Sequence, residues 1–238
     1  MIRRRGEARL DYPKAAIRVH VDNLEIVKLR LRVVEKEPWT VEWLERELRD
    51  DDALYDVGAN VGSYALIAAA LRPRATVVAI EPGPANYEGL CRNVALNGMT
   101  DTVVPLPVGL AATTHLASLG LTDTAAGAAD HVLGETGSAG AVPILAYALD
   151  DLVAAFRLPP PTLLKIDVDG AEDAVLAGAS VTLDSPRLRS LIVEVDVSKT
   201  QPVLDRLADH GFVQTLRVDE RLGRPLPGIW YGVFERSA

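Results

Sequence analysis

One stretch sets the architecture expected for this chain: Leu54-Tyr55-Asp56-Val57-Gly58-Ala59-Asn60-Val61-Gly62-Ser63-Tyr64. The stretch has the pattern of a buried strand that runs into a glycine turn and then into a helix. Glycines at 58 and 62 let the backbone pass close to a ligand where a Cβ atom would collide. The N–H groups at the start of the following helix favour an anionic group. This pattern predicts a ligand-binding turn at the end of a strand in an α/β sheet.

The turn differs from the fingerprint of dinucleotide-binding proteins. Asn60 stands where that fingerprint has its second glycine, and Asp56 precedes the turn. A carboxylate there would repel a pyrophosphate but suits an ammonium group. Glu81 follows the next apolar run, where it can accept hydrogen bonds from two ribose hydroxyls. We therefore expect Asp56, Gly58, Asn60, Gly62 and Glu81 to bind a ligand with an amino acid end and a nucleoside end. The alternative is that Asp56 and Glu81 only cap helices.

The rest of the chain continues the alternation of short apolar runs with helical stretches. Such alternation is typical of a mostly parallel sheet covered by helices. The pattern predicts strands near 53–57, 76–80, 103–108, 162–168 and 189–195, and helices at 63–71, 85–97, 171–178 and 199–210. Two further strand-like runs, 212–218 and 229–234, are joined by a turn too short to hold a crossover helix. They must therefore form an antiparallel pair.

Two segments fall outside this alternation. Residues 1–50 are expected to form an extension, with a half-exposed strand over 26–33 and a helix that starts at Glu37–Pro38. The main domain would then cover 51–238. Within it, residues 111–142 have few large apolar side chains, so they form either a disordered surface loop or a lid over a ligand pocket. Order would resume with a strand over 142–145 and a helix for which Asp150 is the expected N-cap.

Composition excludes several classes of partner. The chain has 238 residues and a net charge of −8, which argues against a surface that binds nucleic acid phosphates. Its apolar runs are too short to cross a bilayer, and no targeting segment is evident at its start, so we expect a cytoplasmic protein without a membrane partner. The single cysteine, Cys91, excludes an internal disulfide and a cysteine-rich zinc site. The sequence leaves a homodimer open.

A second polar group is expected at the carboxyl end of the strand near 162–168. Lys165, Asp167 and Asp169 alternate there, where open α/β sheets bind their ligands. Asp167 or Asp169 could accept the proton of a hydroxyl group or orient that group. In the alternative reading, Lys165 pairs with a carboxylate and Asp169 caps the next helix. His131, in the 111–142 segment, is a further candidate for a base.

The next strand also ends in acids. Glu194 and Asp196 could lie near the same cleft, and together with Asp167 and Asp169 they would suit a hard divalent ion. Solvated acids at strand ends are common, however. We therefore expect no metal.

The chain resembles a known family at several separate places. The matching motifs are Asp56-Val57-Gly58-Ala59-Asn60-Val61-Gly62, Glu81-Pro82, Asn93 with Asn97, Leu149-Asp150-Asp151-Leu152 and Lys165-Ile166-Asp167-Val168-Asp169-Gly170-Ala171-Glu172. They are similar to those of the FkbM family of S-adenosylmethionine-dependent methyltransferases, over about residues 37–196. The resemblance implies a Rossmann-like class I methyltransferase fold with a C-terminal antiparallel strand and a small N-terminal extension. It also implies O-methylation of a small molecule or sugar. Asp56, Gly58 and Gly62 would then hold the methionine end of the cofactor, and Glu81 its ribose.

Two other functions fit the same sheet. An NAD(P)-dependent oxidoreductase is disfavoured by Asn60 and by the absence of a Tyr-x-x-x-Lys pair. A catalytically silent nucleoside-binding module would not need Asp56, Glu81 and Asp167 together. Because one fold hosts many chemistries, the fold alone does not choose among the three.

Overall fold

The computed structural model describes residues 6–21, 30–121, 126–127, 132–133, 137, 139–221 and 224–237. Its centre is a seven-stranded sheet with the order β12-β15-β11-β10-β3-β4-β5. The strands are β3 (Ala53–Val57), β4 (Thr76–Ile80), β5 (Val103–Leu106), β10 (Leu163–Ile166), β11 (Ser190–Asp196), β12 (Phe212–Val218) and β15 (Ile229–Arg236). The first five run parallel to one another, whereas β15 pairs antiparallel with both β11 and β12. The expected mostly parallel sheet with a C-terminal antiparallel strand is confirmed.

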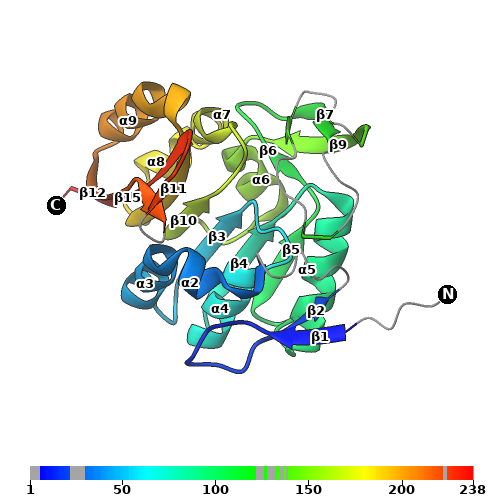
Figure 1. Ribbon diagram of the computed structural model, residues 1–238. Coiled ribbons are helices and arrows are strands. Elements are labelled where there is room, and N and C mark those ends of the chain that lie inside the picture. Colours follow the sequence, from blue (N-terminus) through cyan, green and yellow to red (C-terminus); the bar gives the residue numbers. More distant parts are fainter. Residues whose placement is uncertain are drawn as a thin grey trace.

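Helices cover both faces of this sheet, as Figure 1 shows. On one face α3 (Pro38–Glu47), α4 (Ser63–Leu71) and α5 (Pro84–Leu96) pack against β-strand residues such as Leu54 and Leu163. On the other face α6 (Leu149–Phe156), α7 (Glu172–Ala177), α8 (Ser180–Asp184) and α9 (Thr200–Asp209) pack against Tyr55 and Leu164. Neighbouring residues of β3 and β10 therefore point to opposite cores, because side chains alternate along a strand. A short 3₁₀ turn, Val197–Lys199, precedes α9.

The N-terminal segment contributes to the first of these cores. It contains the hairpin β1 (Gly6–Arg9) and β2 (Arg18–Val21), followed by α2 (Val33–Lys36). Asn93 of α5 and its C-cap residue Asn97 accept hydrogen bonds from the backbone of β2, at 2.8 Å from His20 N and 2.9 Å from Arg18 N. The strand expected over 26–33 is wrong where it can be checked: Arg30 and Leu31 are helical and α2 begins at Val33. Residues 22–29 lie outside the described part of the chain.

The segment expected as a loop or a lid contributes strands to a second sheet. Its order is β6-β9-β7-β8, with β6 (Gly109–Leu110), β7 (His115–Gly120), β8 (Val132–Leu133) and β9 (Ala141–Tyr147). Its own apolar cluster among the described residues is small, with Leu119, Leu121 and Ile144 buried, while Leu110 of β6 joins a core of the seven-stranded sheet. This agrees with a composition that offers little core of its own.

Asp150 acts on a different helix from the one expected. The N-cap of α6 is Ala148, and Asp150 lies within the first turn. Its carboxylate instead accepts hydrogen bonds from the backbone N–H groups of Val181 and Thr182, at 2.7 and 2.9 Å. These N–H groups belong to the first turn of α8, which has no side-chain cap of its own. The prediction that Asp150 caps a helix is therefore correct in kind but wrong in the helix, because tertiary packing brings its carboxylate to α8.

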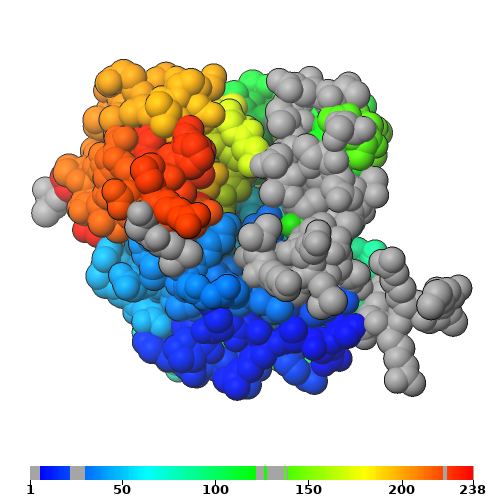
Figure 2. All heavy atoms as spheres, viewed as in Figure 1, coloured from blue at the N-terminus to red at the C-terminus, as the bar shows by residue number. Residues whose placement is uncertain are grey.

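A last short hairpin, β13 (Glu220–Arg221) and β14 (Arg224–Pro225), connects β12 to β15. It brings C-terminal residues next to the N-terminal segment, and Figure 2 shows these blue and orange-red surfaces meeting on one face. Arg221 forms an ion pair with Glu37 at 3.2 Å, and Arg46 forms one with Glu235 at 3.0 Å. Among the described residues, no helix has both the length and the apolar character needed to cross a membrane.

Candidate active site

A cavity of about 260 Å³ lies at the carboxyl ends of β3, β4, β10 and β11. This is the edge at which open parallel sheets bind their ligands. It is lined by apolar residues, by acids and by three cations. The lining residues are Arg30, Lys36, Val57, Gly58, Asn60, Ile80, Glu81, Pro82, Asn86, Val108, Gly109, Leu110, Leu119, Asp167, Val168, Asp169, Ala171, Glu194, Arg221 and Ile229.

The glycine turn forms one wall of this cavity. Gly58 has φ of +78°, and a Cβ atom there would lie 1.9 Å from the carbonyl oxygen of Asp167. Asn60 is also left-handed, with φ of +52°. Gly62, with φ of +90°, does not line the cavity, and a Cβ atom there would meet Leu90. The two glycines therefore shape the turn, while Gly58 and Asn60 supply its ligand-facing surface.

Glu81 lies at the tip of β4, in the wall next to the turn. Its Oε2 accepts the backbone N–H of Asn60 at 2.8 Å, and its Oε1 accepts the backbone N–H of Gly83 at 2.8 Å. Burial raises the pKa of Glu81 to about 7, against the lowering effect of those N–H donors. Because Gly83 is the N-cap residue of α5, the capping interpretation is partly correct. The same carboxylate also faces the cavity, so it can serve a ligand as well.

Asp56 is not among the residues that line the cavity. Its side chain is only 1% exposed and lies between the sheet and α4. The ammonium group that it meets belongs to the chain itself: Lys165 Nζ is 3.2 Å from Asp56 Oδ1. The register of the parallel strands sets this contact, since Lys165 is the partner of Asp56 between β10 and β3. Direct contact between Asp56 and a ligand is therefore not supported.

Lys165 also binds the acid that follows its strand. Its Nζ donates to Asp167 Oδ2 at 2.9 Å and lies 5.0 Å from the centre of the Tyr64 ring. Burial acts to raise the pKa of Asp167, but the Lys165 ammonium, together with the charges of Lys36 and Arg30, outweighs burial and holds that pKa below its usual value. Asp167 therefore stays ionised at neutral pH. The expected pairing of Lys165 with a carboxylate is confirmed, and it involves two carboxylates.

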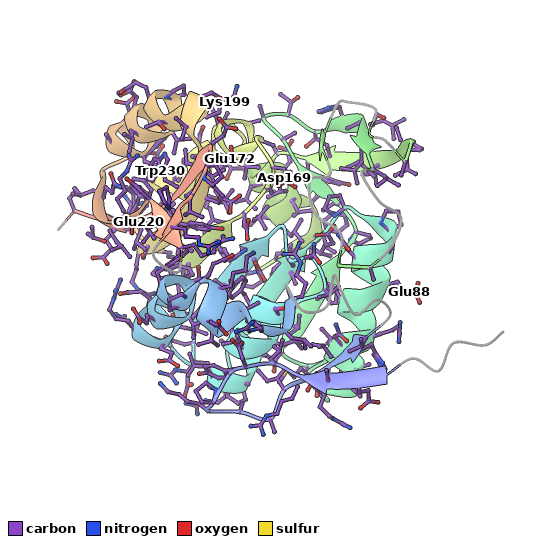
Figure 3. The ribbon with its side chains drawn as sticks, viewed as in Figure 1. Glu88, Asp169, Glu172, Lys199, Glu220 and Trp230 are labelled. Carbon is purple, nitrogen blue, oxygen red and sulfur yellow. The ribbon has the colours of Figure 1, made fainter. Side chains whose placement is uncertain are left out.

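Asp169 lies in the cavity wall, in the segment between β10 and α7, and Figure 3 labels it. It is not the N-cap of α7, because that helix begins at Glu172 with Ala171 in the N-cap position. Glu172 instead folds back and accepts the N–H of Gly170 at 2.9 Å. His131, the third candidate for proton transfer, lies outside the described residues.

A buried polar network not expected from the sequence closes the other side of the cavity. Glu37 is only 2% exposed, and its Oε1 forms ion pairs with Lys36 Nζ at 2.9 Å and with Arg221 Nη2 at 3.2 Å. The Tyr64 hydroxyl donates to Glu37 Oε2 at 2.5 Å. Arg221 also donates to the Tyr231 hydroxyl at 2.8 Å. In the sequence these are ordinary charged and aromatic residues on distant segments, so no local signal marks them.

Glu194 joins this network at the end of β11. Its Oε2 accepts the hydroxyl of Tyr231. Burial raises the pKa of Glu194 to about 8, and the charge of Asp167 acts in the same direction. Asp196 is not among the cavity-lining residues and instead accepts the backbone N–H of Ser198 at 2.7 Å. Within the described part of the chain, no three histidine, cysteine or acidic side chains are grouped so as to hold a metal ion.

Comparison with known proteins identifies the family. Residues 56–213 match the model of the methyltransferase FkbM domain. The chain is 32% identical over 180 residues to the hexuronic acid methyltransferase AglP of Haloferax volcanii, covering 76% of this chain and 70% of that protein. It is 30% identical over 201 residues to the 31-O-demethyl-FK506 methyltransferase FkbM of Streptomyces tacrolimicus, covering 73% and 77%.

Solved structures agree at the level of the fold. The crystal structure of a methyltransferase FkbM from Methylobacillus flagellatus matches with a TM-score of 0.55 at 16% identity, over 79% of this chain and 45% of that one. The sheet order and the antiparallel β15 thus belong to the class I methyltransferase fold. The chain is therefore a member of the FkbM family of methyltransferases, which take their methyl group from S-adenosylmethionine.

Proposed function

We propose that this protein methylates a hydroxyl group of a small molecule, with sugars and natural products as the leading acceptor classes. One observation carries the proposal. A single cavity joins the wall of Gly58, Asn60 and Glu81 to a second wall that carries Asp167 and Asp169. A donor site and an acceptor site thereby share one space, as direct transfer between two ligands requires.

The residues present fit the cofactor. Glu81 brings a carboxylate, held by two backbone N–H groups, to a wall that also contains the apolar side chains of Ile80 and Val108. A carboxylate accepts hydrogen bonds from ribose hydroxyls and repels phosphates, and apolar walls suit an adenine ring. Glu81, Gly58 and Asn60 would hold the nucleoside, while Asp56 and Gly62 would act indirectly by fixing Lys165 and the turn. When bound, S-adenosylmethionine supplies an electrophilic methyl group on a cationic sulfur.

Asp167 would position the acceptor hydroxyl. Lys165 binds Oδ2, so the other carboxylate oxygen can accept a hydrogen bond from the hydroxyl group. Methyl transfer from the cofactor to the hydroxyl oxygen would leave S-adenosylhomocysteine and release the hydroxyl proton, which Asp167 or Asp169 would accept and pass to solvent water. Because the pKa of Asp167 is held low, orientation and electrostatic stabilisation would outweigh proton removal in its role. Asp169 lies in the same wall and could assist.

Two relatives support the choice of acceptor. The AglP relative is named for hexuronic acid and the Streptomyces tacrolimicus relative for a demethylated FK506 oxygen. Both names describe small organic acceptors, which agrees with the acidic balance of this chain. Leu119 of β7 lines the cavity, which supports a lid role for the 111–142 segment. The cytoplasmic location, the absence of a nucleic acid partner, the homodimer and the division into 1–50 and 51–238 stay predictions.

A thermal-shift panel tests the cofactor. S-adenosylhomocysteine should stabilise the protein and NAD should not, since ligands that bind only the folded state raise the melting temperature. Stabilisation by NAD alone would favour the oxidoreductase, and no response to either would contradict both.

Turnover tests the role of Asp167. Asp167→Asn should leave the affinity for S-adenosylhomocysteine nearly unchanged and lower the rate of methyl transfer. A variant with a normal rate would remove Asp167 from the reaction.

A further inference from the structure

The cavity has walls of opposite charge. Asp167 and Asp169 lie on the side formed by the segment after β10, whereas Lys36 and Arg221 come from the N-terminal segment and the β13–β14 hairpin. The positive wall stands out in a chain with a net charge of −8. In the reaction described above, Lys36 only helps to lower the pKa of Asp167, and Arg221 has no part.

The positive wall holds two cationic side chains against one carboxylate. Lys36 and Arg221 both contact the same oxygen of Glu37, at 2.9 and 3.2 Å, so two cations share one carboxylate. The other oxygen of Glu37 is occupied by the Tyr64 hydroxyl. At Glu37 the two cations therefore outnumber the carboxylate, and their side chains are 26% and 24% exposed and line the cavity.

Arg221 is also held in place before any ligand arrives. Its Nη2 donates to both Glu37 and Tyr231, and Tyr231 in turn donates to Glu194. Its Nε is buried and has no hydrogen-bond partner in the described structure. A guanidinium fixed in this way loses little conformational entropy when it binds a planar anion.

The charge of the cofactor decides which wall suits which ligand. A cationic sulfur is attracted to Asp167 and Asp169 and repelled by Lys36 and Arg221. The third cation, Arg30, acts on the nucleoside side as well, because its charge lowers the pKa of Glu81, whereas Lys36 acts ahead of Arg30 in lowering the pKa of Asp167. Lys36 and Arg221 are thus left to face the acceptor.

We propose that Lys36 and Arg221 form an anion subsite that binds a carboxylate on the acceptor, so that the enzyme selects acidic sugars or similarly acidic hydroxyl compounds. This inference rests on the proposed methyl transfer and adds the charge class of its substrate. The carboxylate would bind across the Lys36 and Arg221 side chains and place a neighbouring hydroxyl group toward Asp167.

The test compares two probes that differ at one group. The methyl glycosides of glucuronic acid and of glucose carry a carboxylate and a hydroxymethyl group at the same position. Calorimetric titration of the protein saturated with S-adenosylhomocysteine should show at least roughly tenfold tighter binding of the glucuronide, the order expected for one charge-assisted hydrogen bond. Arg221→Met and Lys36→Met should each lose most of this preference, and Arg221→Lys should recover part of it.

Arg224→Met is the matched control. Arg224 lies on the partner strand of the same hairpin, opposite Arg221, is exposed and does not line the cavity. Its removal changes the net charge equally and should leave the preference intact. If thermal unfolding shows that Arg221→Met is poorly folded, Lys36→Met still tests the proposal. The Lys36 side chain is partly exposed, and without it Arg221 keeps its ion pair with Glu37.

Several results would overturn the proposal of an anion subsite. They are equal affinity for the two glycosides, binding of neither, or an equal loss in Arg224→Met. Weaker binding of S-adenosylhomocysteine in both Lys36→Met and Arg221→Met, with the preference kept, would assign these cations to the cofactor instead. Failure of the wild-type protein to bind S-adenosylhomocysteine at all would refute the proposed methyl transfer, and the first titration step detects this separately.

Discussion

Removing the Lys165 ammonium should destabilise the protein strongly. Its Nζ lies 3.2 Å from Asp56 and 2.9 Å from Asp167, and the lysine side chain is only 4% exposed. Loss of one partner from a buried ion pair typically costs about 3–5 kcal/mol, because a charge is left without compensation. For a chain of this size that corresponds to a fall in melting temperature of roughly 6–20 °C. We therefore expect this loss in Lys165→Met, measured by urea and thermal unfolding.

The loss should grow with pH. Burial raises the pKa of Asp56, and Lys165 opposes it; without the lysine this pKa and that of Asp167 both rise. A carboxyl group whose pKa is higher in the folded than in the unfolded state favours folding while protonated, and this contribution is lost as pH rises through the folded value. Lys165→Met should therefore be closer to wild type at pH 5.5 than at pH 8.

Two comparisons make this prediction decisive. Adding Asp56→Asn to Lys165→Met should restore at least about 1 kcal/mol, since the uncompensated carboxylate is gone. Lys14→Met, which breaks an exposed pair with Glu45, should cost at most about 1 kcal/mol. A Lys165→Met protein as stable as Lys14→Met, or equally destabilised at both pH values, would refute the reasoning.

Three further predictions concern other parts of the site. Glu81→Ala should weaken binding of S-adenosylhomocysteine by roughly 1.5–3 kcal/mol, the range for losing a charged hydrogen-bond partner, and an unchanged calorimetric affinity would remove Glu81 from the cofactor site. Gly58→Ala should destabilise the protein far more than Gly98→Ala: both positions have positive φ, but only at Gly58 does a Cβ atom meet backbone, 1.9 Å from Asp167 O. Equal unfolding free energies for the two variants would contradict that clash. The pKa of Glu194 is raised from 4.5 to about 8, so its contribution to stability is lost as pH rises between those values. Glu194→Gln should gain stability relative to wild type across this interval, and parallel pH profiles in chemical denaturation would disprove the shift.

The elements that sequence predicted well are those with local signals. The strand, turn and helix around Gly58 follow from apolar periodicity and from two glycines that adopt positive φ. Strands 53–57 and 76–80 match β3 and β4 at both ends. The strand expected over 26–33 failed at Arg30 to Val33 because alternation over so few residues does not separate strand from helix.

The site was only partly predictable, because its decisive contacts are long-range. From the sequence, Asp56 was assigned to the ammonium group of a ligand, whereas the ammonium group that it meets belongs to Lys165, which lies 109 positions along the chain and is brought to it by strand register. The role of Arg221 depends on a hairpin that folds back onto Glu37, at a sequence separation of 184. Neither pairing leaves a periodic or compositional trace in the sequence.

The position of β15 has a consequence for synthesis on the ribosome. Because β15 inserts between β11 and β12, the open edge of β11 stays without its neighbour while α9 and β12 are being made. An unpaired edge of a nascent sheet can recruit the wrong strand, including one from another nascent chain. The sheet therefore cannot be completed before residues 229–236 are made. A ribosome stalled shortly before them would hold a chain with most of its helices but with an incomplete sheet on the β11 side.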